Sequence, residues 1–124
     1  MELSSARHAF VTGGASGIGL GIVDALTQHG ISVTIADIDR QAVEAVTAER
    51  SPAICGVGLD VRDRDSWAQA KVDAESVFGP VNILVNNAGI TRDMLMRRIT
   101  DEQWDDVMAV NLRGPFLMCR AFVE

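Results

Sequence analysis

The sequence has no tyrosine, only two cysteines and few aromatic residues of any kind, and these shortages exclude several kinds of protein. Without tyrosine, no reaction of this chain can use a tyrosine side chain as its acid or base. Cys55 and Cys119 lack the spacing of metal ligands. We expect both thiols to be reduced and buried as small apolar groups, and we expect no metal site.

Long hydrophobic runs and basic clusters are missing as well. No run approaches the ~20 apolar residues of a membrane span. The N-terminal stretch MELSSARHAF has neither a long apolar core nor the small-residue cleavage site of a secretory signal. We therefore expect a cytoplasmic protein without a membrane partner.

The formal net charge of −6 argues against nucleic acid as a partner, because phosphate binding there depends on clustered Lys and Arg. The net charge does not exclude a small anionic ligand, since backbone N–H groups at a helix start can bind a phosphate without any cation.

The sequence does contain a regular alternation of strand-like and helix-like segments. Short apolar or β-branched runs predict strands at 8–12, 31–36, 53–60 and 81–87. Amphipathic stretches predict helices from Ile18 to a stop at Gly30, over 40–50, from Asp63 or Asp65 to Gly79, and from a Thr100–Gln103 capping box onward. The pattern predicts one α/β domain over 1–124, a Rossmann-like doubly wound parallel sheet with helices on both faces.

A glycine-rich stretch, VTGGASGIGLG (11–21), joins the first predicted strand to the first predicted helix. Gly13, Gly17 and Gly19 have the spacing G-x-x-x-G-x-G. A turn without Cβ atoms at a helix start leaves backbone N–H donors open to a pyrophosphate. The alternative is a tight turn that only allows close packing of helix on strand.

Two carboxylates follow later strands. Asp37 ends the second strand, at about the distance (~20 residues) where a dinucleotide site places its acid on the adenosine ribose. A carboxylate there accepts hydrogen bonds from both ribose hydroxyls and repels a 2′-phosphate, which favours NAD over NADP, although Arg40 is near in sequence. Asp60 stands after the third strand and could accept the adenine amino group. The alternatives are a solvated turn charge for Asp37 and a turn or cap residue for Asp60.

Four motifs, TGGASGIG (12–19), LDV (59–61), NNAG (86–89) and VNL (110–112), have the order and spacing of the short-chain dehydrogenase/reductase family. The chain resembles this family from about residue 6 to its last residue. The stretch NNAGITRDMLM (86–96) further resembles the 3-oxoacyl-(acyl-carrier-protein) reductase and acetoacetyl-CoA reductase branch. The resemblance implies hydride transfer between a nicotinamide dinucleotide and a hydroxyl or carbonyl compound, such as a 3-oxoacyl thioester.

The resemblance also implies which residues contact the cofactor: Gly13, Ser16, Gly17, Ile18, Gly19, Asp37, Ile38, Asp60, Val61, Asn87, Ala88 and Gly89. Asn86 would help to fix the sheet, and both asparagines could equally satisfy backbone groups at a strand end. Ser16 stands where NADPH-preferring members often carry a basic residue, which agrees with NAD.

Asn111 is the one catalytic candidate. Pro115 has no N–H, so the carbonyl of Asn111 loses its helical partner if the helix continues through the proline. A free carbonyl at a bend follows. In the family, the matching carbonyl holds a water that connects the catalytic lysine to solvent. The alternative is a kinked helix whose carbonyl simply meets water or a side chain.

The family's catalytic serine, tyrosine and lysine lie downstream of this asparagine, and a chain without tyrosine cannot supply the set. We therefore expect the cofactor-binding half of an oxidoreductase, ending after about four strands and inactive alone. A non-catalytic nucleotide-binding or interaction module is the alternative. The apolar stretches 83–85 and 115–124 favour the cofactor-binding half over the module. They also predict a homo-oligomer or self-association through the sheet edge and last helix.

The remaining candidates carry weaker expectations. We expect packing roles for Met94, Met96, Met108 and Met118, an anchoring role for Trp104 at the start of the last helix, and either a substrate loop or a solvated pair for Arg92 and Asp93.

Overall fold

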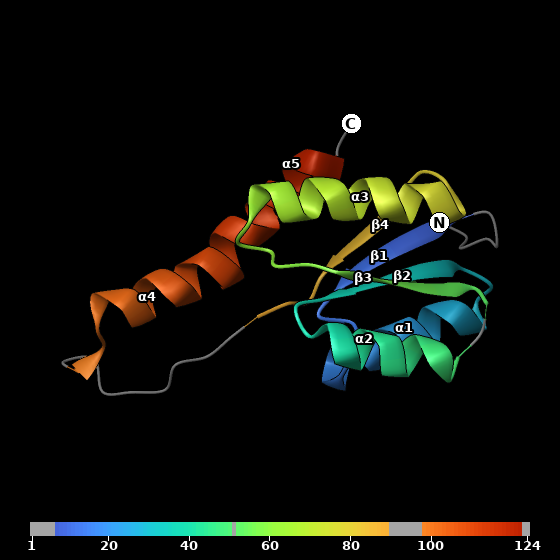
Figure 1. The fold of residues 1–124 in the computed structure, drawn as a ribbon, viewed down its shortest axis with the longest axis horizontal. Coiled ribbons are helices and arrows are strands. Elements are labelled where there is room, and N and C mark those ends of the chain that lie inside the picture. Colours follow the sequence, from blue (N-terminus) through green and yellow to red (C-terminus); the bar gives the residue numbers. More distant parts are fainter. Residues whose placement is uncertain (1–6, 51, 90–97, 123–124) are drawn as a thin grey trace.

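The computed structural model describes residues 7–50, 52–89 and 98–122, which form a parallel sheet covered by helices (Figure 1). The strands are β1 (His8–Thr12), β2 (Ser32–Asp37), β3 (Ile54–Gly58) and β4 (Ile83–Asn86). Their order is β3-β2-β1-β4, and every pairing is parallel. The predicted doubly wound sheet is confirmed. Because β4 lies beside β1 on the side away from β2, the strand order reverses here and opens a crevice at the carboxyl ends.

Helices cover both faces of the sheet (Figure 1). On one face lie α1 (Gly17–Gln28) and α2 (Arg40–Ala48), and on the other α3 (Arg64–Phe78) and α5 (Gly114–Phe122). Between β4 and α5 the chain runs through α4 (Asp101–Met108) and a π-helical segment, η2 (Ala109–Arg113). α4 projects from the sheet and its covering helices (Figure 1).

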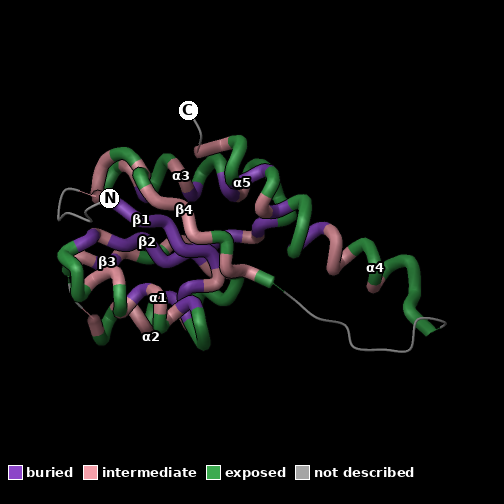
Figure 2. The backbone as a smooth tube through the Cα atoms, turned by 180° about the vertical axis from the view of Figure 1, so that it is seen from behind, coloured by how far each residue is buried: buried purple, intermediate pink, exposed green. Residues whose placement is uncertain are grey.

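The central strand β1 divides the core into two clusters. All five of its residues are buried (Figure 2). Ala9 and Val11 face α1 and α2, whereas Phe10 faces α3 and α5, as the two-residue period of a strand requires. No residue of β4 is fully buried, because β4 forms an edge of the sheet in the described residues.

The predicted helix signals match the observed ends. Asp63 is the N-cap of α3, and its side chain accepts a hydrogen bond from the backbone N–H of Asp65. Thr100 and Gln103 form the reciprocal capping box of α4. Gly79 ends α3 with a φ of 78°. These local signals were readable because each rests on a few neighbouring residues.

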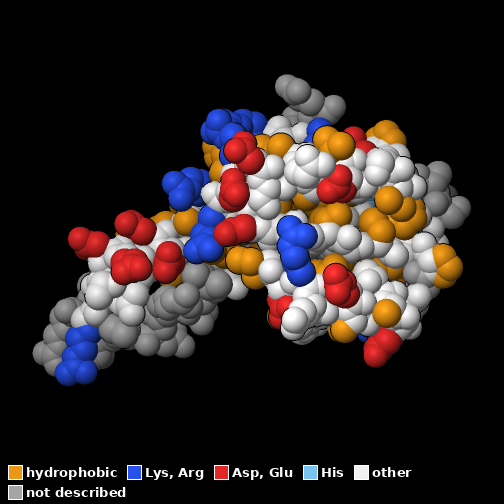
Figure 3. Space-filling model, viewed as in Figure 1, with side chains coloured by type: hydrophobic (Ala, Val, Ile, Leu, Met, Phe, Trp, Pro, Cys, Tyr) orange, Lys and Arg blue, Asp and Glu red, His pale blue; other side chains and the backbone are white. Residues whose placement is uncertain are grey.

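The predicted last helix contains the π segment η2 around Asn111, where a bend was predicted. Two other expectations, about Trp104 and about the thiols, were wrong. Trp104 is 57% exposed and belongs to neither core cluster of the described residues, and α4 as a whole has no buried residue. Acidic side chains gather on the face of α4 that Figure 3 shows. Cys119 is exposed and Cys55 is half-buried, so neither thiol is fully buried as expected. Met118 is buried as predicted, Met108 is half-buried, and Arg92, Asp93, Met94 and Met96 lie outside the described residues.

None of the helices in the described ranges combines the length and the apolar character that crossing a membrane requires. Within the same ranges, no three His, Cys, Asp or Glu side chains gather in a way that could hold a metal ion.

Candidate dinucleotide-binding site

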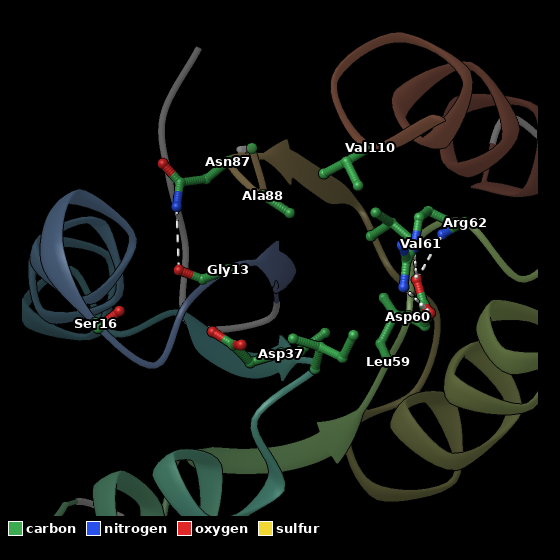
Figure 4. Close-up of a pocket in the computed structure, with 13 residues that line it drawn as sticks. Gly13, Ser16, Asp37, Leu59, Asp60, Val61, Arg62, Asn87, Ala88 and Val110 are labelled. Atoms are coloured by element: carbon green, nitrogen blue, oxygen red, sulfur yellow. Dashed lines mark hydrogen bonds and ion pairs between the residues drawn. The ribbon is translucent and has the colours of Figure 1, made fainter. Parts of the chain in front are cut away.

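A cavity of about 460 Å³ opens beyond the carboxyl ends of the strands, at the reversal of strand order (Figure 4). Nine of the twelve predicted cofactor residues line it: Gly13, Ser16, Asp37, Ile38, Asp60, Val61, Asn87, Ala88 and Gly89. Ala36, Leu59, Arg62 and Val110 line it as well. Gly17, Ile18 and Gly19 form the first turn of α1 and do not line the cavity.

The glycine turn leaves the start of α1 open. Gly13 and Gly17 have φ values of 65° and 57°, a conformation that favours glycine. Ser16 is the N-cap, yet its side chain accepts no cap hydrogen bond within the described residues, and the first turn of α1 has no acidic residue. A Cβ built on Gly17 would meet nothing within 4 Å. The first N–H groups of α1 are thus available to an anion.

Gly19 has a different role from Gly17. It is buried, and a Cβ there would overlap the carbonyl oxygen of Gly13 and crowd the amide nitrogen of Asn87. Gly19 therefore lets α1 approach the turn closely, which is the packing alternative left open by the sequence. The packing interpretation thus applies to Gly19, whereas the space at Gly17 is open.

A buried threonine that the sequence analysis missed fixes the far wall of the cavity. The Thr12 hydroxyl donates to the carbonyl of Val85 (3.3 Å) and accepts from the backbone N–H groups of Asn87 (3.0 Å) and Ala88 (3.1 Å). The Asn87 side chain donates to the carbonyl of Gly13 (3.1 Å). Asn87 therefore both lines the cavity and ties the loop after β4 to the glycine turn (Figure 4).

Asn86 lies opposite Thr12 in the register of β1 and β4. Its amide donates to the Cys119 sulfur on α5 at 3.3 Å. The side chain thus links the end of β4 to α5, in keeping with the expected structural role.

Asp37 lies at the end of β2, beside the glycine turn and across the cavity from Arg62 (Figure 4). Its carboxylate accepts from the backbone N–H groups of Ala15 (3.4 Å) and Asp39 (3.2 Å). Arg40 points elsewhere, because its guanidinium lies over Gly58, close to where a Cβ of that residue would stand. Arg40 lines a separate groove with Gly58 and does not line this cavity.

Asp60 stands opposite, where the chain leaves the third strand, and forms an ion pair with Arg62. The guanidinium donates from Nε to Oδ1 and from Nη2 to Oδ2, both at 3.0 Å, and the Arg62 backbone N–H donates to Oδ1 at 3.0 Å. This pairing is the main reason that the pKa of Asp60 lies below its ordinary value. Asp60 is not the cap of α3, a role that Asp63 fills.

The remaining walls are largely apolar. Leu59 and Val61 are buried, and Val61 also packs against Gly114, where a Cβ would stand 3.1 Å from its Cγ2. Ile38 is 64% exposed at the rim. Leu59 and Val110 stand inside the quoted motifs LDV and VNL, so the sequence carried a signal for them. Apolar walls with a few polar groups suit a flat base and its sugar.

Asn111 lies in η2, next to the cavity but not in its lining. A Cβ on Gly89 would stand 3.4 Å from Asn111 Oδ1, which places Asn111 beside the loop after β4. In η2 the N–H of Gly114 donates to the carbonyl of Ala109, five residues back, so the helix widens here. The predicted irregularity therefore takes the form of a π segment, a feature found often near functional sites.

An open parallel sheet whose glycine turn, helix start and acidic strand end surround one cavity defines a Rossmann-type dinucleotide-binding protein. The chain belongs to the short chain dehydrogenase family, whose family model matches residues 7–124. The resemblance seen in the four motifs is confirmed.

Known relatives agree with this assignment. The chain is 41% identical over 116 residues to an uncharacterized oxidoreductase of Mycobacterium bovis, covering 91% of this chain and 47% of the relative. It is 36% identical over 118 residues to a 3-oxoacyl-(acyl-carrier-protein) reductase of Haemophilus influenzae, covering 95% and 49%. A solved 3-ketoacyl-(acyl-carrier-protein) reductase from Brucella melitensis, complexed with NADH, superposes with a TM-score of 0.88 at 36% identity, over 92% of this chain and 48% of that one. The chain thus spans about half the length of the curated relatives it matches.

Proposed function

We propose that this chain is the cofactor-binding half of an NAD-dependent oxidoreductase that interconverts a hydroxyl and a carbonyl compound. The observation that carries the proposal is that an uncapped helix start and the Asp37 carboxylate meet at one cavity. The backbone N–H groups at Gly17 and Ile18 would bind the diphosphate, and Asp37 would bind the adenosine ribose. The bound nicotinamide would supply the hydride or accept it.

The preference for NAD rests on the charges near Asp37. Its carboxylate would accept hydrogen bonds from the 2′- and 3′-hydroxyls, and it would repel a 2′-phosphate. Arg40, the cation nearest in sequence, lies over Gly58 and so would not offset that repulsion. Ser16 adds no positive charge to the turn.

Isothermal titration with NAD and NADP tests the preference. We expect NAD to bind at least about tenfold more tightly, because juxtaposed like charges cost several kcal/mol. Asp37→Ala should bring the ratio of the affinities for NAD and NADP closer to one. Glu44→Ala, which removes an exposed carboxylate from α2 outside the cavity, should leave it unchanged. Equal affinities in the unmodified chain would refute the preference for NAD.

Asn111 would act through its main-chain carbonyl by holding a water for the proton path, and the widening of η2 at this residue supports that role. The proton donor itself must come from outside this sequence, which has no tyrosine. We expect no oxidation of NADH when the chain alone is mixed with an acetoacetyl thioester. Clear turnover by the isolated chain would overturn this part of the proposal.

A non-catalytic nucleotide-binding module is the second candidate, since the absence of tyrosine is compatible with it as well. It predicts the same cofactor binding but a chain that remains monomeric. The oligomeric state therefore separates the two candidates where binding cannot.

A further inference from the structure

Arg62 lines the cavity but has no part in the proposed binding of the diphosphate by the glycine turn or of the ribose by Asp37. The lining contains two carboxylates, Asp37 and Asp60, and Arg62 is its one basic residue within the described chain. The guanidinium makes no contact with Asp37. It instead holds Asp60 by two parallel hydrogen bonds of 3.0 Å (Figure 4).

These hydrogen bonds decide what Asp60 can still accept. A carboxylate offers about four acceptor positions, two on each oxygen. Asp60 Oδ1 already accepts from the backbone N–H and the Nε–H of Arg62, and Oδ2 accepts from Nη2. The one position left is on Oδ2. The carboxylate is also fixed, because a bidentate pair prevents its rotation.

We propose that Arg62 sets the base preference of the site by holding Asp60 so that Oδ2 accepts the amino group of adenine. The inference rests on the proposed function, because it assumes that the apolar walls formed by Leu59, Val61 and Val110 receive the base of a dinucleotide. Arg62 is a positioning residue here, since it acts through Asp60. The carboxylate of Asp60 is ionised at neutral pH, and the hydrogen bonds from Arg62 lower its pKa further.

A competing role for Arg62 is mechanical. Its Nη1 stands 3.9 Å from Asp106 Oδ1, so Arg62 also reaches α4. Both side chains are more than a third exposed, and pairs of this kind contribute little to stability. If Arg62 acted mainly through this contact with Asp106, removing the Arg62 side chain would weaken the binding of every dinucleotide to the same degree.

The test compares NAD with nicotinamide hypoxanthine dinucleotide, in which a carbonyl oxygen replaces the adenine amino group. Isothermal titration of the unmodified chain should show about a tenfold preference for NAD, the ratio expected from one hydrogen bond to a charged group. Arg62→Ala should reduce the preference to about twofold, and Asp60→Asn should abolish it, since an amide can present either a donor or an acceptor.

Three further variants separate positioning from other effects. Arg64→Ala removes an exposed cation two residues away, outside the cavity lining, and should leave the tenfold ratio intact. Asp106→Asn breaks the contact with α4 and should also leave it intact. Arg62→Lys keeps the charge but loses the bidentate geometry, so it should behave like Arg62→Ala.

The outcomes are distinguishable. If Arg62→Ala weakens both dinucleotides equally, or if Lys at this position restores the full ratio, the positioning role of Arg62 is wrong while the proposed function stands. The same holds if the unmodified chain binds both dinucleotides with equal affinity. If the unmodified chain binds neither, the proposed function fails and the role of Arg62 falls with it.

Discussion

At the scale of single residues, two glycines of one turn have opposite surroundings. Gly17 has a positive φ and open space where a side chain would stand, whereas Gly19 is in contact with the Gly13 carbonyl. The sequence presents both as members of one motif and cannot tell which faces a ligand. The distinction comes from the path of α1 over β1, which is a tertiary property.

This contrast predicts different consequences of adding one methyl group. Gly19→Ala forces α1 away from the turn and should lower the free energy of unfolding by about 1–3 kcal/mol, as overpacking does. Gly21→Ala is the matched control, because a Cβ at Gly21 of the same helix meets nothing within 4 Å. Urea unfolding followed by circular dichroism measures both. Equal stability of the two variants would contradict the packing role of Gly19.

His8 is a buried histidine in a chain of polar contacts across three strands. Its Nδ1 lies 2.9 Å from the Gly79 carbonyl oxygen, and its Nε2 lies 2.7 Å from the Thr34 hydroxyl, which contacts the Cys55 sulfur at 3.1 Å. Since a carbonyl only accepts, Nδ1 carries the proton and the neutral ring accepts at Nε2. Burial lowers the pKa of His8, against the raising effects of the Gly79 carbonyl and Glu75.

The lowered pKa predicts loss of stability in mild acid. Above pH 6.5, the ordinary value, His8 is neutral in both folded and unfolded chains and stability is full. Below it, the unfolded chain binds a proton that the folded chain resists, so the free energy of unfolding falls until the lowered pKa is reached. Urea unfolding at pH 7.5 and 5.5 measures the loss. His29→Gln, which removes an exposed histidine, should retain it. Unchanged stability between the two pH values would rule out the effect.

At the scale of elements, Thr12 joins β1 to the loop after β4. Its hydroxyl satisfies two backbone N–H groups, those of Asn87 and Ala88, which together form one wall of the cavity. The position of that wall therefore depends on one side chain of the central strand. No hydrogen bond between the β1 and β4 backbones could replace this link beyond the end of the ladder at Asn86.

Thr12→Val keeps the shape and removes the hydroxyl. In the described residues only the Ala88 N–H would then lack a partner, because the Asn87 N–H also donates to the carbonyl of Val85 at 3.1 Å. A backbone N–H left without a partner costs about 1–3 kcal/mol of stability, and the affinity for NAD should fall with it. Thr27→Val is the control, since the Thr27 hydroxyl only donates to the carbonyls of Val23 and Asp24 within α1. We expect it to change stability by about 0.5 kcal/mol or less. Thermal unfolding and titration with NAD check both effects, and a Thr12 variant as stable as the Thr27 variant would contradict the role of this link.

Most secondary-structure elements could be predicted from the sequence, but some contacts between them could not. Strands, caps and helix ends followed from short-range signals such as the Thr100–Gln103 box. Nine of the twelve residues predicted to contact a cofactor line one cavity, and that contact stays a prediction. Thr12 was missed because its partners, Asn87 and Ala88, become known only when β1 and β4 are placed side by side. Arg62 was missed although its partner Asp60 stands only two residues away, because proximity in sequence does not show that the two side chains pair. Trp104 was assigned an anchoring role because an apolar residue at a helix start usually packs, but α4 projects away from the core.

At the scale of the whole molecule, two apolar surfaces are uncovered in the described residues. β4 is a sheet edge with no fully buried residue. A groove along α4, η2 and α5 is lined by Met108, Leu112 and Phe116, and the last two are 65% and 59% exposed. Exposed edges and apolar grooves promote association, although the acidic residues of α4 oppose it.

We accordingly expect the chain to self-associate. Size-exclusion chromatography with light scattering should give a mass above that of the 13.3 kDa monomer, and Phe116→Glu with Leu112→Glu should shift the population toward monomer. The control Val72→Glu, at an exposed position of α3 outside this groove, should leave the oligomeric state unchanged. A clean monomer at all concentrations would favour the non-catalytic module.

The most direct test of the central claim is a titration of ¹⁵N-labelled chain with NAD, followed by the backbone amide signals. The account predicts that the amides of Gly13, Gly17 and Ile18 shift most, together with those of Asp37 and Ile38, because the diphosphate and the ribose lie against them. Absence of shifts at saturating NAD, or shifts centred on the separate groove lined by Arg40 and Ser66, would contradict it.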